Sequence, residues 1–117
     1  MHRMVTGKLH RVRVTETELD YEGSIALDPD LYEAAGFLPG EHLQVFNVNS
    51  GDRFETYLIE APRGSRTVGV RGAAARLAQP GDQLIILTYR LLDESELEGY
   101  RMRVVHVDER NKVTNIT

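Results

Sequence analysis

The chain has 117 residues, enough to bury one modest hydrophobic core but too few for two independent ones. Its 14 Lys and Arg residues and 18 Asp and Glu residues give a formal net charge of −4, and neither sign forms a long block. We therefore expect a single domain, residues 1–117, that binds neither nucleic acid nor a membrane surface.

The composition also limits the chemistry of the protein. Cysteine is absent, which excludes disulfides, thiolate catalysis and Cys-ligated zinc. The four histidines lack the spacing of metal ligands, so we expect no metal site. Charged residues interrupt the N-terminal segment where a secretory signal would be apolar, and no run reaches membrane-spanning length. We expect a soluble, cytoplasmic protein.

Short runs of β-branched and aromatic residues, separated by turn signals, dominate the chain. They predict strands at residues 8–15, 24–27, 43–48, 53–59, 67–70, 84–89, 103–107 and 113–116. The Asn-Ser-Gly-Asp cluster at residues 49–52 joins two of these runs and predicts a β-hairpin. The fold class is therefore mainly β.

Three short helices are indicated by local signals. The first has Asp28 at a capping position, Pro29 at the first helical position and Gly36 at its end. Residues 72–78 and 94–98 predict two more. The acidic residues of the last segment are more typical of a solvated helix face than of paired catalytic carboxylates.

A weak internal repeat runs through the chain. A pair of alanines, a Pro-Gly-acid turn and an apolar strand follow one another at residues 34–46 and again at residues 74–87. Two related halves are consistent with an antiparallel-dominated β-barrel, because closure removes the exposed strand edges of a short all-β chain.

Several longer motifs point to a known family. The segments GKLHRVRVT, DYEGS, LYEAAG, NVNSGDRFETY, RGSR, GAAA and PGD occur in the order and at the spacing of the pyruvoyl-dependent aspartate 1-decarboxylase family. The chain resembles this family over about residues 3–90. The resemblance implies a double-psi β-barrel with short helices and a carboxy-lyase activity.

The resemblance implies that the chain cuts itself between Gly23 and Ser24. The Ser24 hydroxyl would attack the carbonyl of Gly23 to give an ester, and elimination and hydrolysis would turn Ser24 into a covalently bound pyruvoyl group. The products would be a β chain, residues 1–23, and an α chain, residues 24–117. A glycine at this position does not hinder the attack, and Thr56 would donate to the developing oxyanion.

The implied reaction is the decarboxylation of L-aspartate to β-alanine for pantothenate and coenzyme A synthesis. The pyruvoyl ketone formed from Ser24 would take the substrate amine as a Schiff base and accept the electron pair left by CO2. Tyr57 matches the proton donor of the family.

The resemblance also implies a set of substrate-binding residues. Arg53 is the strongest candidate because a guanidinium can hold a carboxylate by two parallel hydrogen bonds. The full implied set is Arg53, Thr56, Lys8, His10, Gly72, Ala73 and Ala74. Family members are homotetramers with active sites between subunits, so Lys8 and Arg53 are expected to act on the Ser24 of a neighbour.

The chain departs from the family pattern at Arg71, where many members have Asn, and no role follows for this longer, charged side chain. Arg71 motivates a second hypothesis, in which the substrate is glutamate or a related acidic amino acid. A third hypothesis is a barrel that binds a ligand or partner without cleaving itself. Whether maturation requires a partner protein stays open.

Overall fold

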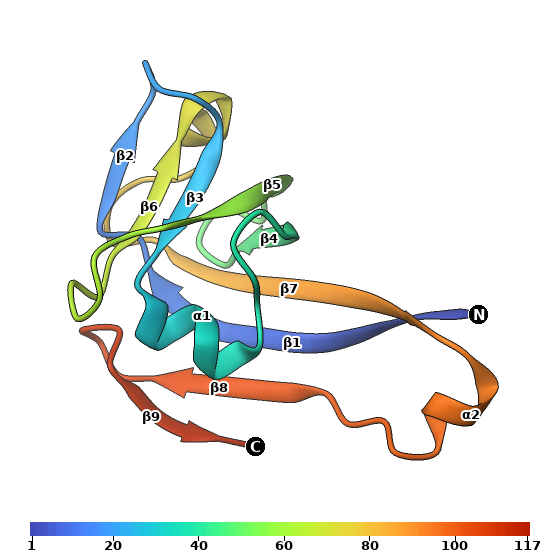
Figure 1. Cartoon of the computed structure of the whole chain (residues 1–117). Coiled ribbons are helices and arrows are strands. Elements are labelled where there is room, and N and C mark those ends of the chain that lie inside the picture. The colour runs from blue at the N-terminus through green and yellow to red at the C-terminus, as the bar shows by residue number, and fades with distance from the viewer.

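The computed structural model describes residues 1–117, and its main feature is one sheet of nine strands (Figure 1). The strand order is β2-β6-β3-β5-β4-β7-β1-β8-β9. The strands are β1 (His2–Arg13), β2 (Glu16–Glu18), β3 (Ser24–Leu27), β4 (His42–Asn47), β5 (Arg53–Glu60), β6 (Val68–Arg71), β7 (Gln83–Leu92), β8 (Arg103–Val107) and β9 (Val113–Ile116). The helices are α1 (Pro29–Ala35), the 3-10 helix η1 (Gly72–Leu77) and α2 (Glu94–Leu97).

All eight predicted strands are present, but two of them are longer than predicted. β1 begins at His2, and β7 continues to Leu92, because the two strands pair antiparallel from His2–Leu92 to Arg13–Gln83. At the far end of this pair apolar and polar residues come in blocks, Met4-Val5 and Leu91-Leu92 beside His2-Arg3 and Arg90, so no period-two alternation signals it. The short strand β2 was not predicted either, and it forms by parallel pairing with β6.

The predicted short helices are confirmed, and their capping explains where they begin and end. The Asp28 carboxylate accepts from the Asp30 N–H at 2.8 Å, and Gly36 ends α1 with a φ of 77°. The predicted helix after Arg71 is a 3-10 helix. α2 begins with a capping box formed by Asp93 and Glu96.

Burial alternates along the central strands and separates two faces of the sheet. Leu9, Val45 and Ile86 face the hydrophobic core and are fully buried, and they lie side by side because both Leu9 and Val45 pair with Ile86. The opposite face, called the outer face below, carries the neighbouring residues of the same strands. It consists of Lys8, His10, Gln44, Phe46, Arg53, Glu55, Tyr57, Ile85 and Leu87.

The internal repeat of the sequence is also a repeat of structure. In the first half the Glu41 carboxylate accepts from the Leu38 N–H at 2.9 Å, and in the second half the Asp82 carboxylate accepts from the Gln79 N–H at 3.0 Å. The strands that follow these turns, β4 and β7, pair antiparallel with each other. The predicted mainly β fold class with short helices is confirmed, and the two related halves agree with a double-psi barrel.

One part of the sheet extends away from the rest. The N-terminal end of β1 and the C-terminal end of β7 form a long arm that carries α2, whereas β2, β3 and β6 lie at the other end of the molecule (Figure 1). No helix in the structure has the length and apolar character needed to cross a membrane.

Candidate active site

Ser24 is a buried residue at the start of β3. Its relative exposure is 1%, and β3 lies between β6, paired antiparallel, and β5, paired parallel. The Ser24 Oγ donates to the backbone oxygen of Glu22 at 3.3 Å. The hydroxyl is therefore turned back along the chain, toward the residues that precede Ser24. This orientation suits an attack on the preceding carbonyl.

Gly72 allows the segment before Ser24 to lie directly against η1. A Cβ atom built on Gly72 would lie 2.5 Å from the Cα and 2.7 Å from the N of Gly23, and 3.0 Å from the backbone oxygen of Tyr21. The φ of Gly72 is also +73°, which favours glycine. Of the next two predicted site residues, Ala73 is exposed and Ala74 packs against the core. Gly72 is thus the residue of this group in direct contact with the Gly23 backbone.

Arg71, to which the sequence assigned no role, lies beside the same segment. Its backbone faces Ser24 in the pairing of β6 with β3. Its guanidinium lies 4.7 Å from the centre of the Tyr21 ring, and its NH2 group lies 3.5 Å from a carboxylate oxygen of Glu16. Its Nε is buried and has no hydrogen-bond partner. Arg71 thus links β6 to β2 and to the segment that precedes Ser24.

Thr56 and Tyr57 lie on β5, next to β3. Ile25 pairs with Leu58 in parallel register. Extending that register back along both strands brings Tyr57 level with Ser24 and Thr56 level with Gly23. Thr56 is half-buried, and Tyr57 is 40% exposed on the outer face. The register therefore brings both predicted residues beside the Gly23–Ser24 peptide.

The predicted cations lie on the outer face of the central strands. His10 pairs with Ile85, Ile85 with Phe46, and Phe46 with Arg53, so His10 and Arg53 stand at the two ends of one row across the sheet. The Arg53 guanidinium lies 4.6 Å from the centre of the Phe46 ring. Lys8 precedes His10 on the same face of β1. This face carries two cations, Lys8 on β1 and Arg53 on β5, on either side of an apolar middle.

His10 has a partner that the sequence did not reveal. The His106 ring lies 5.5 Å from the His10 ring, edge to face, because β1 and β8 pair in parallel. Burial lowers the pKa of His10 below 6.5, and the nearby charges of Lys8, His106 and Arg11 lower it further. The neutral imidazole is therefore favoured at neutral pH. No local sequence signal connects His10 with His106, since their contact depends on strand order.

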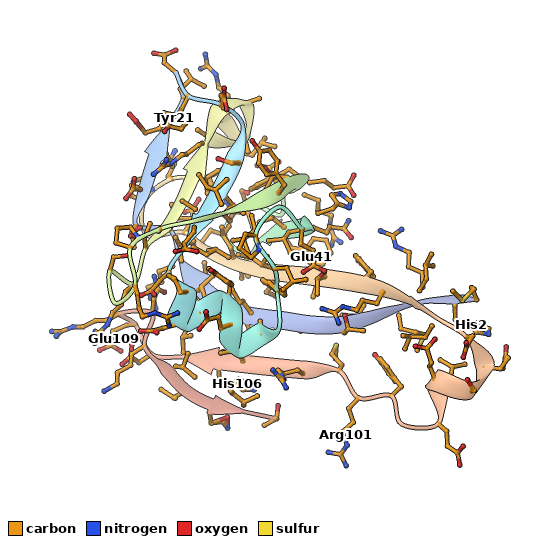
Figure 2. The ribbon with its side chains drawn as sticks, in the orientation of Figure 1. His2, Tyr21, Glu41, Arg101, His106 and Glu109 are labelled. Atoms are coloured by element: carbon orange, nitrogen blue, oxygen red, sulfur yellow. The ribbon has the colours of Figure 1, made fainter.

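Lys8 and His10 are separated from the Gly23–Ser24 peptide within one chain. β7 and β4 lie between β1 and β5, and β3 lies one strand further. At about 4.8 Å per strand, the backbones of β1 and β3 are about 19 Å apart along the sheet. Figure 2 likewise shows Tyr21 far from His106. Lys8 and His10 therefore do not converge on the Ser24 of their own chain.

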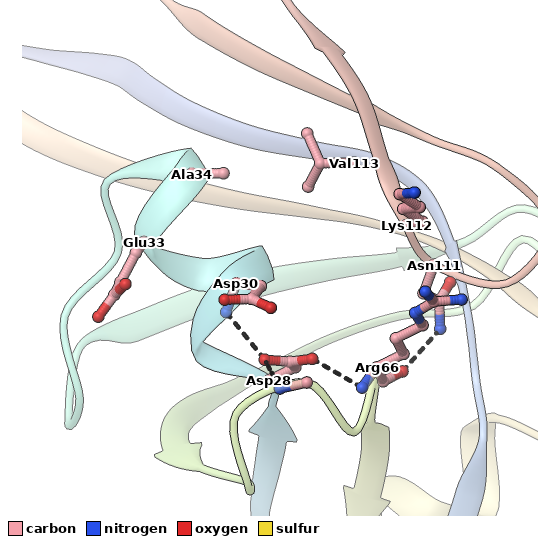
Figure 3. A pocket seen from close by; sticks show the side chains of 9 residues that line it. Asp28, Asp30, Glu33, Ala34, Arg66, Asn111, Lys112 and Val113 are labelled. Carbon is pink, nitrogen blue, oxygen red and sulfur yellow. Dashed lines mark hydrogen bonds between the residues drawn. The ribbon is translucent and has the colours of Figure 1, made fainter.

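None of the cavities in the structure is lined by a predicted site residue. Figure 3 shows the cavity beside the N-terminus of α1. Its central carboxylate, Asp28, accepts from the backbone N–H groups of Asp30, Gly64 and Arg66 at 2.8, 3.1 and 2.7 Å. Asn111 donates to the Arg66 backbone oxygen at 3.1 Å. Because these side chains bond to backbone groups, they join the loops around this cavity and are not arranged as a catalytic centre.

Comparison with known proteins gives consistent matches over almost the whole chain. The family described as "Aspartate decarboxylase" matches residues 1–114. A protein of Maricaulis maris named "Aspartate 1-decarboxylase" is 56% identical over 110 residues, which are 94% of this chain and 91% of that protein. A protein of the same name from Salinibacter ruber is 56% identical over 111 residues, which are 95% of this chain and 76% of that protein.

A third relative, from Pelotomaculum thermopropionicum, also carries the name "Aspartate 1-decarboxylase". It is 52% identical over 113 residues, which are 97% of this chain and 86% of that protein. Identity of this level over nearly the full length of the chain extends beyond the motifs around Gly23–Ser24 and includes the strands that support them. The chain belongs to the aspartate decarboxylase family.

Proposed function

We propose that the protein decarboxylates L-aspartate to β-alanine and CO2 with a pyruvoyl group made from its own Ser24. The observation that carries this proposal is the Ser24 hydroxyl, which is buried and turned back to the Glu22 carbonyl at 3.3 Å, next to a glycine. The shared name of the relatives supports the reaction. β-Alanine made in this way would supply pantothenate and coenzyme A synthesis.

The first step is cleavage of the Gly23–Ser24 peptide. The residues around this peptide fit the step, because Gly72 packs directly against the Gly23 backbone. A side chain at residue 72 would displace that backbone. Thr56 is level with Gly23 and would donate its hydroxyl to the oxygen that becomes negative during the attack. The expected products are residues 1–23 and residues 24–117.

The second step is decarboxylation at the new terminus of residues 24–117. The pyruvoyl group would supply a ketone that binds the substrate amine and accepts the electron pair left by CO2. Tyr57, level with Ser24 and 40% exposed, would hold a proton at its hydroxyl for the carbon that loses CO2. Gly72, Ala73 and Ala74 would leave room for the substrate beside it.

Binding of the two substrate carboxylates falls to the outer face. Arg53 offers a guanidinium whose parallel N–H groups match a carboxylate, Lys8 adds a second cation, and the neutral His10 ring can donate a hydrogen bond from its N–H. Because β7, β4 and β5 lie between Lys8 and His10 on β1 and the Ser24 of their own chain on β3, we infer an assembly in which one copy supplies Lys8 and His10 to the Ser24 of another. A homotetramer with shared active sites, as in the family, meets this requirement.

Aspartate is favoured over glutamate by the names of the relatives, so the Arg71-based alternative substrate has no independent support. The barrel that never cleaves is likewise not favoured by membership of a decarboxylase family. The proposed reaction uses a metabolite of central metabolism, which suits a cytoplasmic enzyme. A maturation factor would be needed only if the purified chain cleaves slowly.

Intact-protein mass spectrometry of the purified chain during warm incubation tests the proposal. We expect two fragments that separate between Gly23 and Ser24, with the larger one blocked at its N-terminus by pyruvoyl. The processed protein should then release CO2 from L-aspartate much faster than from L-glutamate. A chain that stays full length, alone and after incubation with a lysate able to supply a maturation factor, would contradict the proposal.

A further inference from the structure

We propose that Arg71 binds the carboxylate that Gly23 acquires when the chain cuts itself, and so stabilises the leaving group of that reaction. This inference rests on the proposed self-cleavage and assigns a role to the residue at which the chain departs from its family pattern. It concerns a single guanidinium on β6 and a carboxylate that exists only after the reaction.

The chemistry requires a new negative charge at Gly23. In the first stage the Ser24 Oγ bonds to the Gly23 carbonyl carbon, the C–N bond breaks, and the nitrogen takes the hydroxyl proton. In the second stage the Ser24 Cα gives a proton to water, and the Cβ–Oγ bond breaks. Its electron pair leaves with Gly23 as a carboxylate. Water then releases the nitrogen of residue 24 as ammonia and leaves the ketone.

Arg71 lies beside the residues on both sides of that carboxylate. Its backbone faces Ser24 across the β6–β3 pairing. A Cβ atom built on Gly23 would lie 4.0 Å from the Arg71 backbone oxygen, so the two residues are in contact across the strands. The Arg71 guanidinium packs on the ring of Tyr21, 4.7 Å from its centre, in the segment that leads to Gly23.

The guanidinium is not saturated in the uncleaved chain. Its only ion pair is the 3.5 Å contact with Glu16, and its Nε is buried without an acceptor. A buried donor without a partner destabilises the folded state, so such donors are rare in proteins. An acceptor that forms later would remove this cost. The Gly23 carboxylate is an acceptor that the reaction itself produces. A guanidinium also matches a carboxylate with two parallel N–H groups.

A purely structural role for Arg71 predicts a different kinetic result. If Arg71 only held the Tyr21 segment in place, its loss would slow the first stage, and no intermediate would accumulate. If Arg71 binds the leaving carboxylate, its loss slows the second stage, and the ester between Gly23 and Ser24 accumulates. The ester is detectable because hydroxylamine cuts it and releases residues 1–23 as a hydroxamate.

The experiment follows cleavage of the full chain by intact mass, with samples pulsed with hydroxylamine. Arg71→Gln removes the charge, Arg71→Lys keeps the charge without the fork, and Arg76→Gln is the matched control, because Arg76 is exposed and makes no ion pair. Loss of a hydrogen bond to a charged group corresponds to about a 10- to 100-fold effect. We expect Arg71→Gln to slow pyruvoyl formation by that factor and to accumulate the ester.

Two further results would support the role of Arg71. Arg71→Lys should fall between Arg71→Gln and the wild type, and guanidinium ion added to Arg71→Gln should shorten the lifetime of the ester. Arg76→Gln should behave as the wild type. Thermal melting of each variant identifies loss of folding, and Arg71→Lys serves as the test if Arg71→Gln does not fold.

Other results would overturn the inference and can be distinguished from failure of the proposed function. Slow cleavage of Arg71→Gln without a hydroxylamine-sensitive species would assign Arg71 to holding the segment alone. Cleavage of Arg71→Gln at the wild-type rate would remove any role. A wild-type chain that never cleaves would remove the proposed function itself, and this inference with it.

Discussion

Two regions of the molecule differ in how complete they are within one chain. Around the Gly23–Ser24 peptide, Gly72 packs on the backbone and Arg71 on the Tyr21 ring, and β5 runs alongside. On the outer face, by contrast, Lys8 and His10 are separated from Ser24 by β7, β4 and β5. The proposed function therefore requires one chain for cleavage and an assembly of chains for substrate binding.

The largest expected effect comes from Ser24→Ala, which removes the hydroxyl on which both regions depend. We expect no cleavage and no CO2 release from aspartate, because neither the ester nor the pyruvoyl group can form. Circular dichroism and size-exclusion chromatography should be unchanged, since the substitution is small. Release of CO2 by the purified variant would show that the pyruvoyl mechanism is wrong.

Gly72→Ala tests the close packing in the first region. A Cβ at 2.5 Å from the Gly23 Cα forces the scissile segment to move, and a displacement of about 1 Å at a reacting group costs about 100-fold in rate. We expect cleavage, followed by intact mass, to slow by about that factor. Gly64→Ala is the control, since Gly64 also has a positive φ, +83°, but nothing within 4 Å of the added atom. Equal slowing in both variants would attribute the effect to backbone strain.

Thr56→Ala tests the proposed donation of the Thr56 hydroxyl to the oxyanion during cleavage. Loss of an oxyanion donor commonly lowers a rate by about 100- to 1000-fold, so we expect slow cleavage. Thr56→Ser keeps the hydroxyl and should cleave at a rate closer to that of the wild type. Rapid processing of Thr56→Ala would remove this residue from the oxyanion role.

Arg53→Gln tests substrate binding on the outer face. We expect normal cleavage and a KM for aspartate raised by about 10- to 100-fold, because a charge-assisted hydrogen bond to the substrate is lost. Arg110→Gln, an exposed arginine without an ion pair, is the control. Mixed assemblies of Arg53→Gln with Ser24→Ala should recover activity if one copy supplies the arginine to another. No recovery in assemblies proven to be mixed would contradict shared sites.

The smallest expected effect is the pH dependence of His10. Its pKa is lowered in the folded protein, so the unfolded chain binds more protons near pH 6, and the stabilisation is complete above the unfolded pKa of about 6.5. We expect the free energy of unfolding to decrease as the pH falls from about 6.5 toward the lowered folded pKa. His10→Gln should weaken this dependence. The free energy of unfolding is measured with urea at pH 7.5 and 5.5. The same decrease between these pH values in the wild type and in His10→Gln would contradict the prediction.

The sequence predicted the strands, the capping of α1 and the repeated turns because each depends on neighbouring residues. It also pointed to Ser24 and its motifs through resemblance to the family. Sequence patterns could not predict β2, which exists only by pairing with β6, or the contact of His10 with His106. They also gave no role to Arg71, whose neighbours Glu16, Tyr21 and Ser24 lie about 50 residues away in the sequence. These features depend on strand order, which local patterns do not encode.

The position of β1 has a consequence for how a cut chain would refold. Residues 1–23 carry β1, which lies between β7 and β8 inside the sheet, as well as the edge strand β2. A chain cut after Gly23 would therefore stay together by strand pairing, with no covalent connection between its two pieces. Folding of the uncut chain is unimolecular, whereas refolding of the cut form from denaturant requires the pieces to meet and depends on concentration. Cutting after folding would then turn a unimolecular folding reaction into a bimolecular one.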